Sequence, residues 1–181
     1  MSPQGSRYPV TARTVDDTGG AMSTVTVSAF IEAQDVDVWR HLTDLPARAD
    51  WLSAVGDVEV LSPGDLAPGT AWRETRVRPD GVTEAEEFLV VEAAAPARLV
   101  LSSRGAGADY RITWTLRAVE RRRRGCTEVT VEHEAVPTRP YGRVLALILG
   151  GLAARAVDGA LRRDLADLAL AVGPARSAEA A

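Results

Sequence analysis

The chain has 181 residues, of which 46% are hydrophobic and 25% charged, and its formal net charge at pH 7 is -4. This length supports one substantial hydrophobic core rather than two. The acidic balance argues against nucleic acid as the main partner. The single cysteine, Cys126, excludes an internal disulfide and any cysteine cluster for a metal, so a cytoplasmic protein is expected. Its longest apolar stretch, residues 144–154, is short and interrupted by glycine, so no integral membrane association is expected.

The two ends of the chain are expected to be flexible tails. Residues 1–22 contain several prolines and glycines and show no sustained hydrophobic period, so they bury too little apolar area to become ordered. Residues 173–181 follow a Gly-Pro stop signal and are rich in small residues. The ligand-binding domain is therefore predicted at residues 23–172.

The first elements of this domain are a strand and two short helices. Residues 24–31 alternate between Thr or Ser and apolar side chains, which is typical of a half-buried strand. Asp35 is a candidate N-cap for a short helix that ends before Pro46. A second short helical stretch ends near Trp51 and Leu52.

Six further strands are predicted, each bounded by turn residues such as Ser-Pro-Gly or Pro-Asp-Gly. Their ranges are 58–61, 71–77, 82–92, 99–103, 110–119 and 127–136. Consecutive hairpins favour an antiparallel meander, so the sheet should contain seven strands in all.

A long amphipathic helix is predicted after Pro140, because apolar residues recur at helical spacing from Val144 to Val172. Its first half is apolar almost all round. Charged residues are expected to form a solvent-exposed face in its second half, namely Arg155, Asp158, Arg162, Arg163, Asp164 and Asp167. A twisted sheet must bend around one such helix or leave space beside it. The sequence therefore predicts an α+β fold in which a curved antiparallel sheet grips the helix and encloses an apolar pocket.

Local motifs support the same fold. They are Val38–Asp44 with Trp51 and Val58–Leu61, Pro68–Thr70, Pro96–Leu99, Gly125–Val129 and the terminal helix. In this order and spacing they resemble the polyketide cyclase/dehydrase branch of the START-like, or SRPBCC, superfamily over about residues 23–172. The resemblance implies a helix-grip fold with a deep pocket. Members range from lipid and hormone carriers to polyketide cyclases and partner-binding proteins, so the fold alone does not choose a function.

Candidate pocket residues lie on the last two strands and on the helix. Alternation places Tyr110 and Trp114 on the inward face of one strand and His133 among apolar residues of the next. His133 could act as a general acid or base on a bound carbonyl compound, or it is a core histidine satisfied by a neighbour. Trp114 could line the pocket or pack in the core. Ile148 and Leu152 are expected to line the pocket from the helix.

The strand at 71–77 carries a second candidate group. Trp72, Glu74 and Arg76 share one face, and the tryptophan suggests that this face points inward. Glu74 and Arg76 could then orient an oxygenated ligand or polarise its carbonyl. The alternative is a weakly stabilising salt bridge on the outer surface.

Two features admit both a functional and a structural interpretation. Residues Arg121–Arg124 could bind phosphate or an acidic partner, or they form a solvated turn. Glycines 150, 151 and 159 could leave volume for a ligand or let the helix bend, or they allow close packing of helix on sheet.

Three functions follow from these residues and from the resemblance. The first is binding of a hydrophobic, oxygen-bearing small molecule, lipid-like or polyketide-like, in the internal pocket. The second is a polyketide aromatase/cyclase or dehydratase, in which His133 or Tyr110 transfers protons and Arg76 steadies an enolate. The third is a protein-interaction module with a vestigial pocket. No cofactor and no metal are expected, and a protein partner cannot be named from the sequence.

Overall fold

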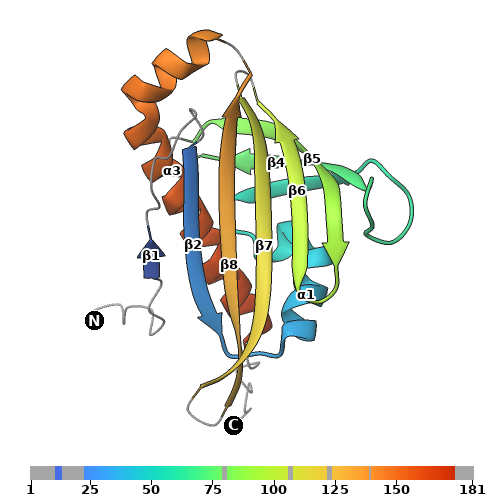
Figure 1. Cartoon of the computed structure of the whole chain (residues 1–181). Coiled ribbons are helices and arrows are strands. Elements are labelled where there is room, and N and C mark those ends of the chain that lie inside the picture. Colours follow the sequence, from blue (N-terminus) through green and yellow to red (C-terminus); the bar gives the residue numbers. More distant parts are fainter. Residues whose placement is uncertain are drawn as a thin grey trace.

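The structure, a computed structural model, describes residues 11–13, 23–78, 81–105, 108–121, 124–138 and 140–173. Side chains are not described at 11–13, 121, 124, 137 and 140–152. Within these ranges the chain forms one antiparallel sheet wrapped around a long helix (Figure 1). The elements are β1 (Thr11–Arg13), β2 (Ser23–Ile31), α1 (Asp35–Thr43), α2 (Arg48–Trp51), β3 (Val55–Val60), β4 (Ala71–Val77), β5 (Thr83–Ala94), β6 (Arg98–Arg104), β7 (Ala108–Arg121), β8 (Arg124–Pro137) and α3 (Pro140–Val172).

The seven predicted strands correspond to β2–β8. They are joined by an eighth strand, β1, which lies in the segment expected to be a tail and pairs with β2 through Thr11 and Ser28. The strand order is β1-β2-β8-β7-β6-β5-β4-β3. The meander from β3 to β8 is thus continued by β2, which pairs antiparallel with β8.

The sheet is strongly curved. In Figure 1, β4 lies behind β2, β7 and β8 and runs across their direction. Register shifts between Val55 and Asp57 in β3 and between Val90 and Glu92 in β5 mark irregularities of the kind that bend strands. The curvature turns one face of the sheet inward, toward α3.

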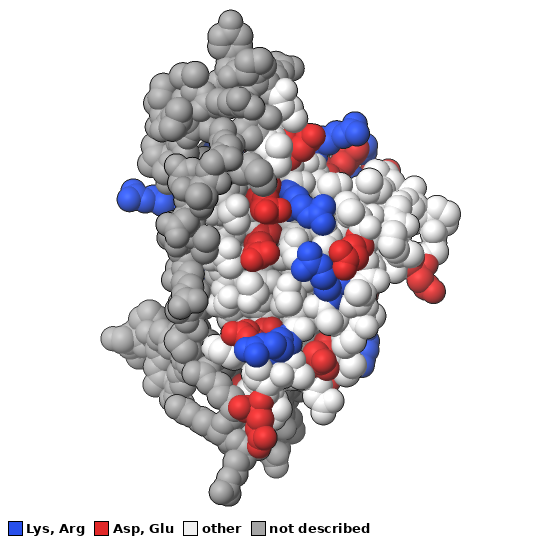
Figure 2. All heavy atoms as spheres, viewed as in Figure 1, with Lys and Arg blue, Asp and Glu red and all other residues white. Residues whose placement is uncertain are grey.

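The outer face carries charges of both signs. Figure 2 shows acidic and basic side chains interspersed over the described part of this face. Several of them form cross-strand pairs, such as Arg117 with Glu128. In this view the described residues form no dominant patch of one charge sign. A nucleic-acid-binding surface would be expected to show a patch of positive charge.

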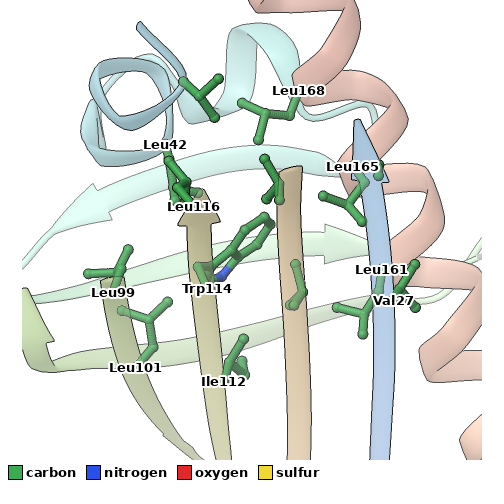
Figure 3. Packing of buried hydrophobic residues seen from close by; sticks show 14 of the residues in the cluster. Val27, Leu42, Leu99, Leu101, Ile112, Trp114, Leu116, Leu161, Leu165 and Leu168 are labelled. Carbon is green, nitrogen blue, oxygen red and sulfur yellow. The ribbon is translucent and has the colours of Figure 1, made fainter. Parts of the chain in front are cut away.

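The hydrophobic core lies between the inner face of the sheet and the second half of α3 (Figure 3). Leu165 and Leu168 are fully buried there against strand residues such as Val27, Trp114 and Leu116. Each such side chain contributes about 1.5–3 kcal/mol through burial. This packing fixes which face of α3 meets the sheet.

Helix α1 closes one end of the core through its buried residues Val38 and Leu42. The helix begins at Asp35, with Gln34 at the N-cap position, so the expectation that Asp35 is the N-cap is wrong. The Asp35 carboxylate nevertheless accepts a hydrogen bond from the backbone N–H of Val36 at 2.8 Å. With Asp37 it places negative charge in the first turn, where the helix dipole favours it.

One of the three helical glycines can be assessed. Gly159 is exposed, and a Cβ built there would meet nothing within 4 Å, so close helix–sheet packing does not explain it. Gly150 and Gly151 lie outside the residues whose surroundings are described. In the described part of the chain, no helix is both long and apolar enough to cross a bilayer.

Candidate functional site

Strand β4 turns Trp72, Glu74 and Arg76 toward the interior, as its alternation predicted. Trp72 is 1% exposed and Glu74 is 0% exposed. The opposite face carries Arg73, which pairs with exposed carboxylates on β3 and β5. The outer-surface alternative for Glu74 and Arg76 is therefore wrong.

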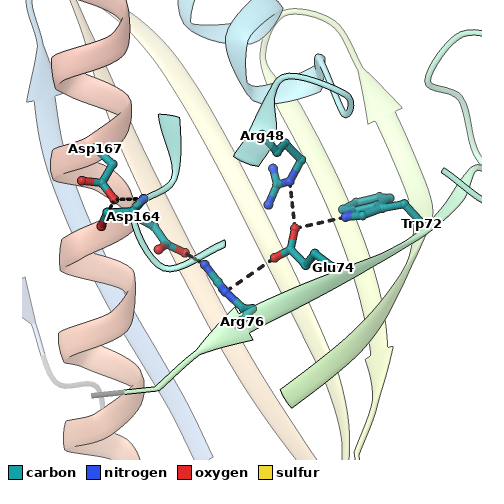
Figure 4. Close-up of polar contacts among 7 residues, drawn as sticks. Arg48, Trp72, Glu74, Arg76, Asp164 and Asp167 are labelled. Atoms are coloured by element: carbon teal, nitrogen blue, oxygen red, sulfur yellow. Dashed lines mark hydrogen bonds and ion pairs between the residues drawn. The ribbon is translucent and has the colours of Figure 1, made fainter. Parts of the chain in front are cut away.

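Glu74 is held by a buried arginine that the sequence did not reveal. Arg48 of α2 donates a hydrogen bond from Nε to Oε2 of Glu74 at 3.0 Å, and the same oxygen accepts one from Trp72 Nε1 at 3.3 Å (Figure 4). The Arg48 guanidinium lies 5.5 Å from the centre of the Trp72 ring and 5.8 Å from that of Trp51, a cation–π arrangement. Burial pushes the pKa of Glu74 upward, but Arg48 and Arg76 outweigh it, so the pKa lies below its ordinary value. Glu74 is ionised at neutral pH.

Arg76 connects Glu74 to helix α3. Its Nε lies 3.6 Å from Oε1 of Glu74, and its Nη2 lies 2.6 Å from Oδ2 of Asp164 (Figure 4). Asp164 was expected on the solvent-exposed face of the helix, but it is only 5% exposed, so that expectation is wrong. It lies one helical turn from Leu161 and from Leu168, on the same stripe, and Arg76 balances its charge. Burial raises the pKa of Asp164 by more than Arg76 lowers it.

A neighbouring contact ties the same helix to the loop after α2. Ser53 donates hydrogen bonds from its backbone N–H and from Oγ to Oδ2 of Asp167, at 2.9 and 2.7 Å. The two aspartates of α3 therefore reach different partners from adjacent turns (Figure 4). Together they fix the second half of α3 against α2 and β4.

Tyr110 and His133 meet on the inner face of β7 and β8. Their ring centres lie 5.2 Å apart, with planes tilted by 41°, and both residues are half-buried. His133 stands opposite Ile112 in the β7–β8 ladder, beyond buried Val131. Burial lowers the pKa of His133, so its ring is neutral at pH 7 and can accept a proton.

Two residues on the intervening strands extend this polar surface from β4 to β8. Glu86 of β5 stands opposite Glu74, and Ser103 of β6 stands opposite Tyr110. Burial raises the pKa of Glu86, and the nearby Ser103 hydroxyl offsets part of this, although Ser103 Oγ makes no well-formed hydrogen bond. The inner face thus carries polar groups on five neighbouring strands.

Residues 22–173 match the model of the family described as polyketide cyclase / dehydrase and lipid transport. The chain belongs to this family. The resemblance noted in the sequence is thereby confirmed, while comparison with curated proteins finds no match.

Several solved structures have the same fold as this chain. The Zhui aromatase/cyclase from a Streptomyces species has a TM-score of 0.65 at 16% identity, over 83% of this chain and 93% of that one. The di-domain ARO/CYC BexL of the BE-7585A biosynthetic pathway gives 0.64 at 21% identity, over 89% and 51%. The TTHA0849 protein of Thermus thermophilus gives 0.62 at 21% identity, over 82% and 96%. These likenesses show the helix-grip fold.

The other predicted site residues of this polyketide cyclase/dehydrase family member fall into two groups. Trp114 is 5% exposed and belongs to the core (Figure 3), and Trp72 stacks on Phe88 with ring centres 5.2 Å apart. The side chains of Ile148 and Leu152 lie outside the described residues, as do those of Arg121–Arg124. Trp72 and Trp114 are thus buried packing residues, whereas Tyr110 and His133 are half-buried on the inner face.

A separate hollow of about 360 Å³ lies on the surface between α1 and the loop from β3 to β4. It is lined by Trp39, Arg40, Thr43, Asp44, Asp65 and Leu66. None of the predicted ligand-binding residues belongs to it. Among the described side chains, no group of three or more His, Cys, Asp or Glu residues is arranged to hold a metal ion.

Proposed function

We propose that the protein binds a hydrophobic, oxygen-bearing small molecule in the cytoplasm, in a pocket between the inner face of the sheet and the first half of α3. The observation that carries this proposal is the Tyr110–His133 pair, which is half-buried on an inner face built mainly of apolar side chains. Ligand sites typically combine apolar walls with a few converging polar groups. The buried free thiol of Cys126 fits a reducing compartment.

The position of α3 supports the same site. The helix begins just after β8 ends, at the end of the sheet that carries Tyr110 and His133 (Figure 1). Its second half fills the core with leucines, whereas its first half has the almost wholly apolar sequence of residues 144–154. A ligand at this end would meet the ring atoms of Tyr110 and His133 on the side of the sheet.

An enzyme is the second candidate, because Tyr110 and His133 are in contact and His133 is neutral at pH 7. Such a pair can transfer protons in a cyclase or dehydratase reaction. The family description and the two aromatase/cyclase structures support such a reaction on a polyketide-like substrate. In this case Tyr110→Phe or His133→Phe should retain binding and lose rate.

Native mass spectrometry of the purified protein, followed by denaturing extraction, tests the binding proposal. A stoichiometric lipid-like or polyketide-like molecule is the expected result, and the extracted compound then serves as substrate for a turnover assay. A protein that is empty and binds none of a panel of such compounds would overturn the proposal. It would favour the interaction module, whose binding should weaken with salt and on neutralising Arg121–Arg124.

A further inference from the structure

Unmet hydrogen-bonding atoms gather at one place in the interior. Among the described side chains, four buried polar atoms lack a hydrogen-bond partner, and three of them are Glu74 Oε1, Ser103 Oγ and Asp164 Oδ1. Glu74 and Asp164 both contact Arg76, and Ser103 lies near Glu86, which itself faces Glu74 across the β4–β5 ladder. A buried polar atom without a partner is costly. Two such atoms beside one arginine, with a third near Glu86, indicate a place built for a further partner.

On Glu74 and Asp164, the atoms that lack a hydrogen-bond partner are carboxyl oxygens, which act as acceptors when the group is ionised. Ionised Glu74 offers only acceptor oxygens: Oε2 accepts hydrogen bonds from Arg48 and Trp72, whereas Oε1 has the 3.6 Å ion pair with Arg76 Nε but no hydrogen bond. Asp164 pairs with Arg76 through Oδ2 and has no hydrogen bond at Oδ1. Arg76 is correspondingly neutralised, with one carboxylate on each side. The cluster also includes Glu86, so carboxyl groups outnumber the two arginines, Arg48 and Arg76. An anionic ligand would meet no free positive charge there.

We propose that this cluster is a subsite for a hydrogen-bond donor of the bound molecule. Glu74 Oε1 or Asp164 Oδ1 accepts a hydrogen bond from a neutral hydroxyl group of that molecule, and a carboxylate is disfavoured at the same place. This inference rests on the proposed function. It replaces the role expected from the sequence, in which Arg76 itself holds an enolate.

The cluster is partly exposed on one side. The Arg76 side chain is 24% exposed and Glu86 is half-buried, whereas Glu74 and Asp164 lie behind them. Glu74 Oε1 and Asp164 Oδ1 are shielded from solvent, so a molecule on the inner face has to displace the Arg76 or Glu86 side chain to reach them. Because the surroundings are buried, a hydroxyl bound there gives a strong, charge-assisted hydrogen bond.

Three probes with one ring system test the inference: 2-naphthol, 2-methoxynaphthalene and 2-naphthoate. At neutral pH the first offers a hydroxyl donor, the second has no donor, and the third is an anion. Isothermal titration calorimetry measures the affinity of each for the wild-type chain. We expect 2-naphthol to bind about tenfold or more tightly than 2-methoxynaphthalene, and 2-naphthoate to bind most weakly.

A matched pair of variants on α3 locates the preference. Asp164→Asn places an amide N–H₂ donor where the unpaired acceptor was, while its oxygen can still face Arg76. It should lower the affinity for 2-naphthol about tenfold and leave that for 2-methoxynaphthalene unchanged. Asp158→Asn makes the same change in a carboxylate that pairs with Arg162 outside the cluster, and it should alter neither affinity. The comparison of the three probes on the wild-type chain holds whether or not Asp164→Asn folds.

Each outcome decides between the two proposals. Equal binding of 2-naphthol and 2-methoxynaphthalene would overturn the donor subsite and leave the binding function in place. Tightest binding of 2-naphthoate would overturn it in favour of an anion site at Arg76. Failure of all three probes to bind would overturn the proposed inner-face site and this inference with it.

Discussion

Arg76 Nη2 and Asp164 Oδ2 lie 2.6 Å apart, and this ion pair joins strand β4 to helix α3 across the interior. Both partners are largely shielded from water, with side chains 24% and 7% exposed. Screening by solvent is therefore weak, and loss of one partner leaves the other poorly compensated. The contact links the packing of the helix to the polar groups of the inner face.

Asp164→Ala should lower the free energy of unfolding by about 2 kcal/mol, because it leaves the Arg76 guanidinium with one carboxylate partner instead of two. Urea denaturation followed by tryptophan fluorescence measures the change. Asp158→Ala on the same helix is the control and should be close to neutral. Equal effects of the two substitutions would contradict the account of α3 docking.

Glu74→Gln should cost more, about 3 kcal/mol, because Arg48 then remains buried without a charged partner. The matched substitution is Glu87→Gln, which removes a carboxylate that pairs with Arg73 on the exposed face of the neighbouring strand. This control should change stability too little to resolve. A Glu74→Gln variant as stable as the control would show that the buried pair contributes little.

His133 should make stability depend on pH. Burial lowers its pKa in the folded state, so below the ordinary value of about 6.5 the unfolded chain binds more protons than the folded one. The free energy of unfolding should therefore fall as pH decreases through that region. His133→Gln should show a smaller fall between about pH 7.5 and about pH 5.5 than the wild type. An unchanged slope in His133→Gln would refute the assignment of the pH dependence to His133.

The face of α3 that meets the sheet can be tested with two leucines. Leu165 is fully buried, whereas Leu170 is 76% exposed. Leu165→Ala should destabilise the protein by about 2–5 kcal/mol, while Leu170→Ala should have little effect. Chemical denaturation of both variants checks this, and a larger loss in Leu170→Ala would place the wrong face of the helix against the sheet.

The alternation of short strands predicted the inner face well. On β4, a period of two placed Trp72 and Glu74 inward, and the burial of both confirms it. The same reasoning placed Trp114 inward on β7, where it is buried. Period-two patterns need only local sequence, because successive side chains of a strand point to opposite faces of the sheet.

The polar contacts of the interior could not be predicted in the same way. Asp164 was assigned to solvent by residue type, although its spacing from Leu161 and Leu168 places it on the buried stripe. Arg48 lies on a helix of only four residues, which is too short to show a period. Its partner Glu74 lies 26 residues further along the chain, so only the tertiary fold brings them together.

Hydrogen–deuterium exchange with saturating 2-naphthol tests the central claim most directly, because it reports where a ligand sits without prior choice of residues. The account predicts slower exchange of the backbone amides around Tyr110 on β7, around His133 on β8 and in α3, and also around Glu74 on β4, where the hydroxyl is expected to bind. Protection confined to α1 and the β3–β4 loop, where the surface hollow lies, or no protection anywhere, would contradict the assignment of the binding site to the inner face.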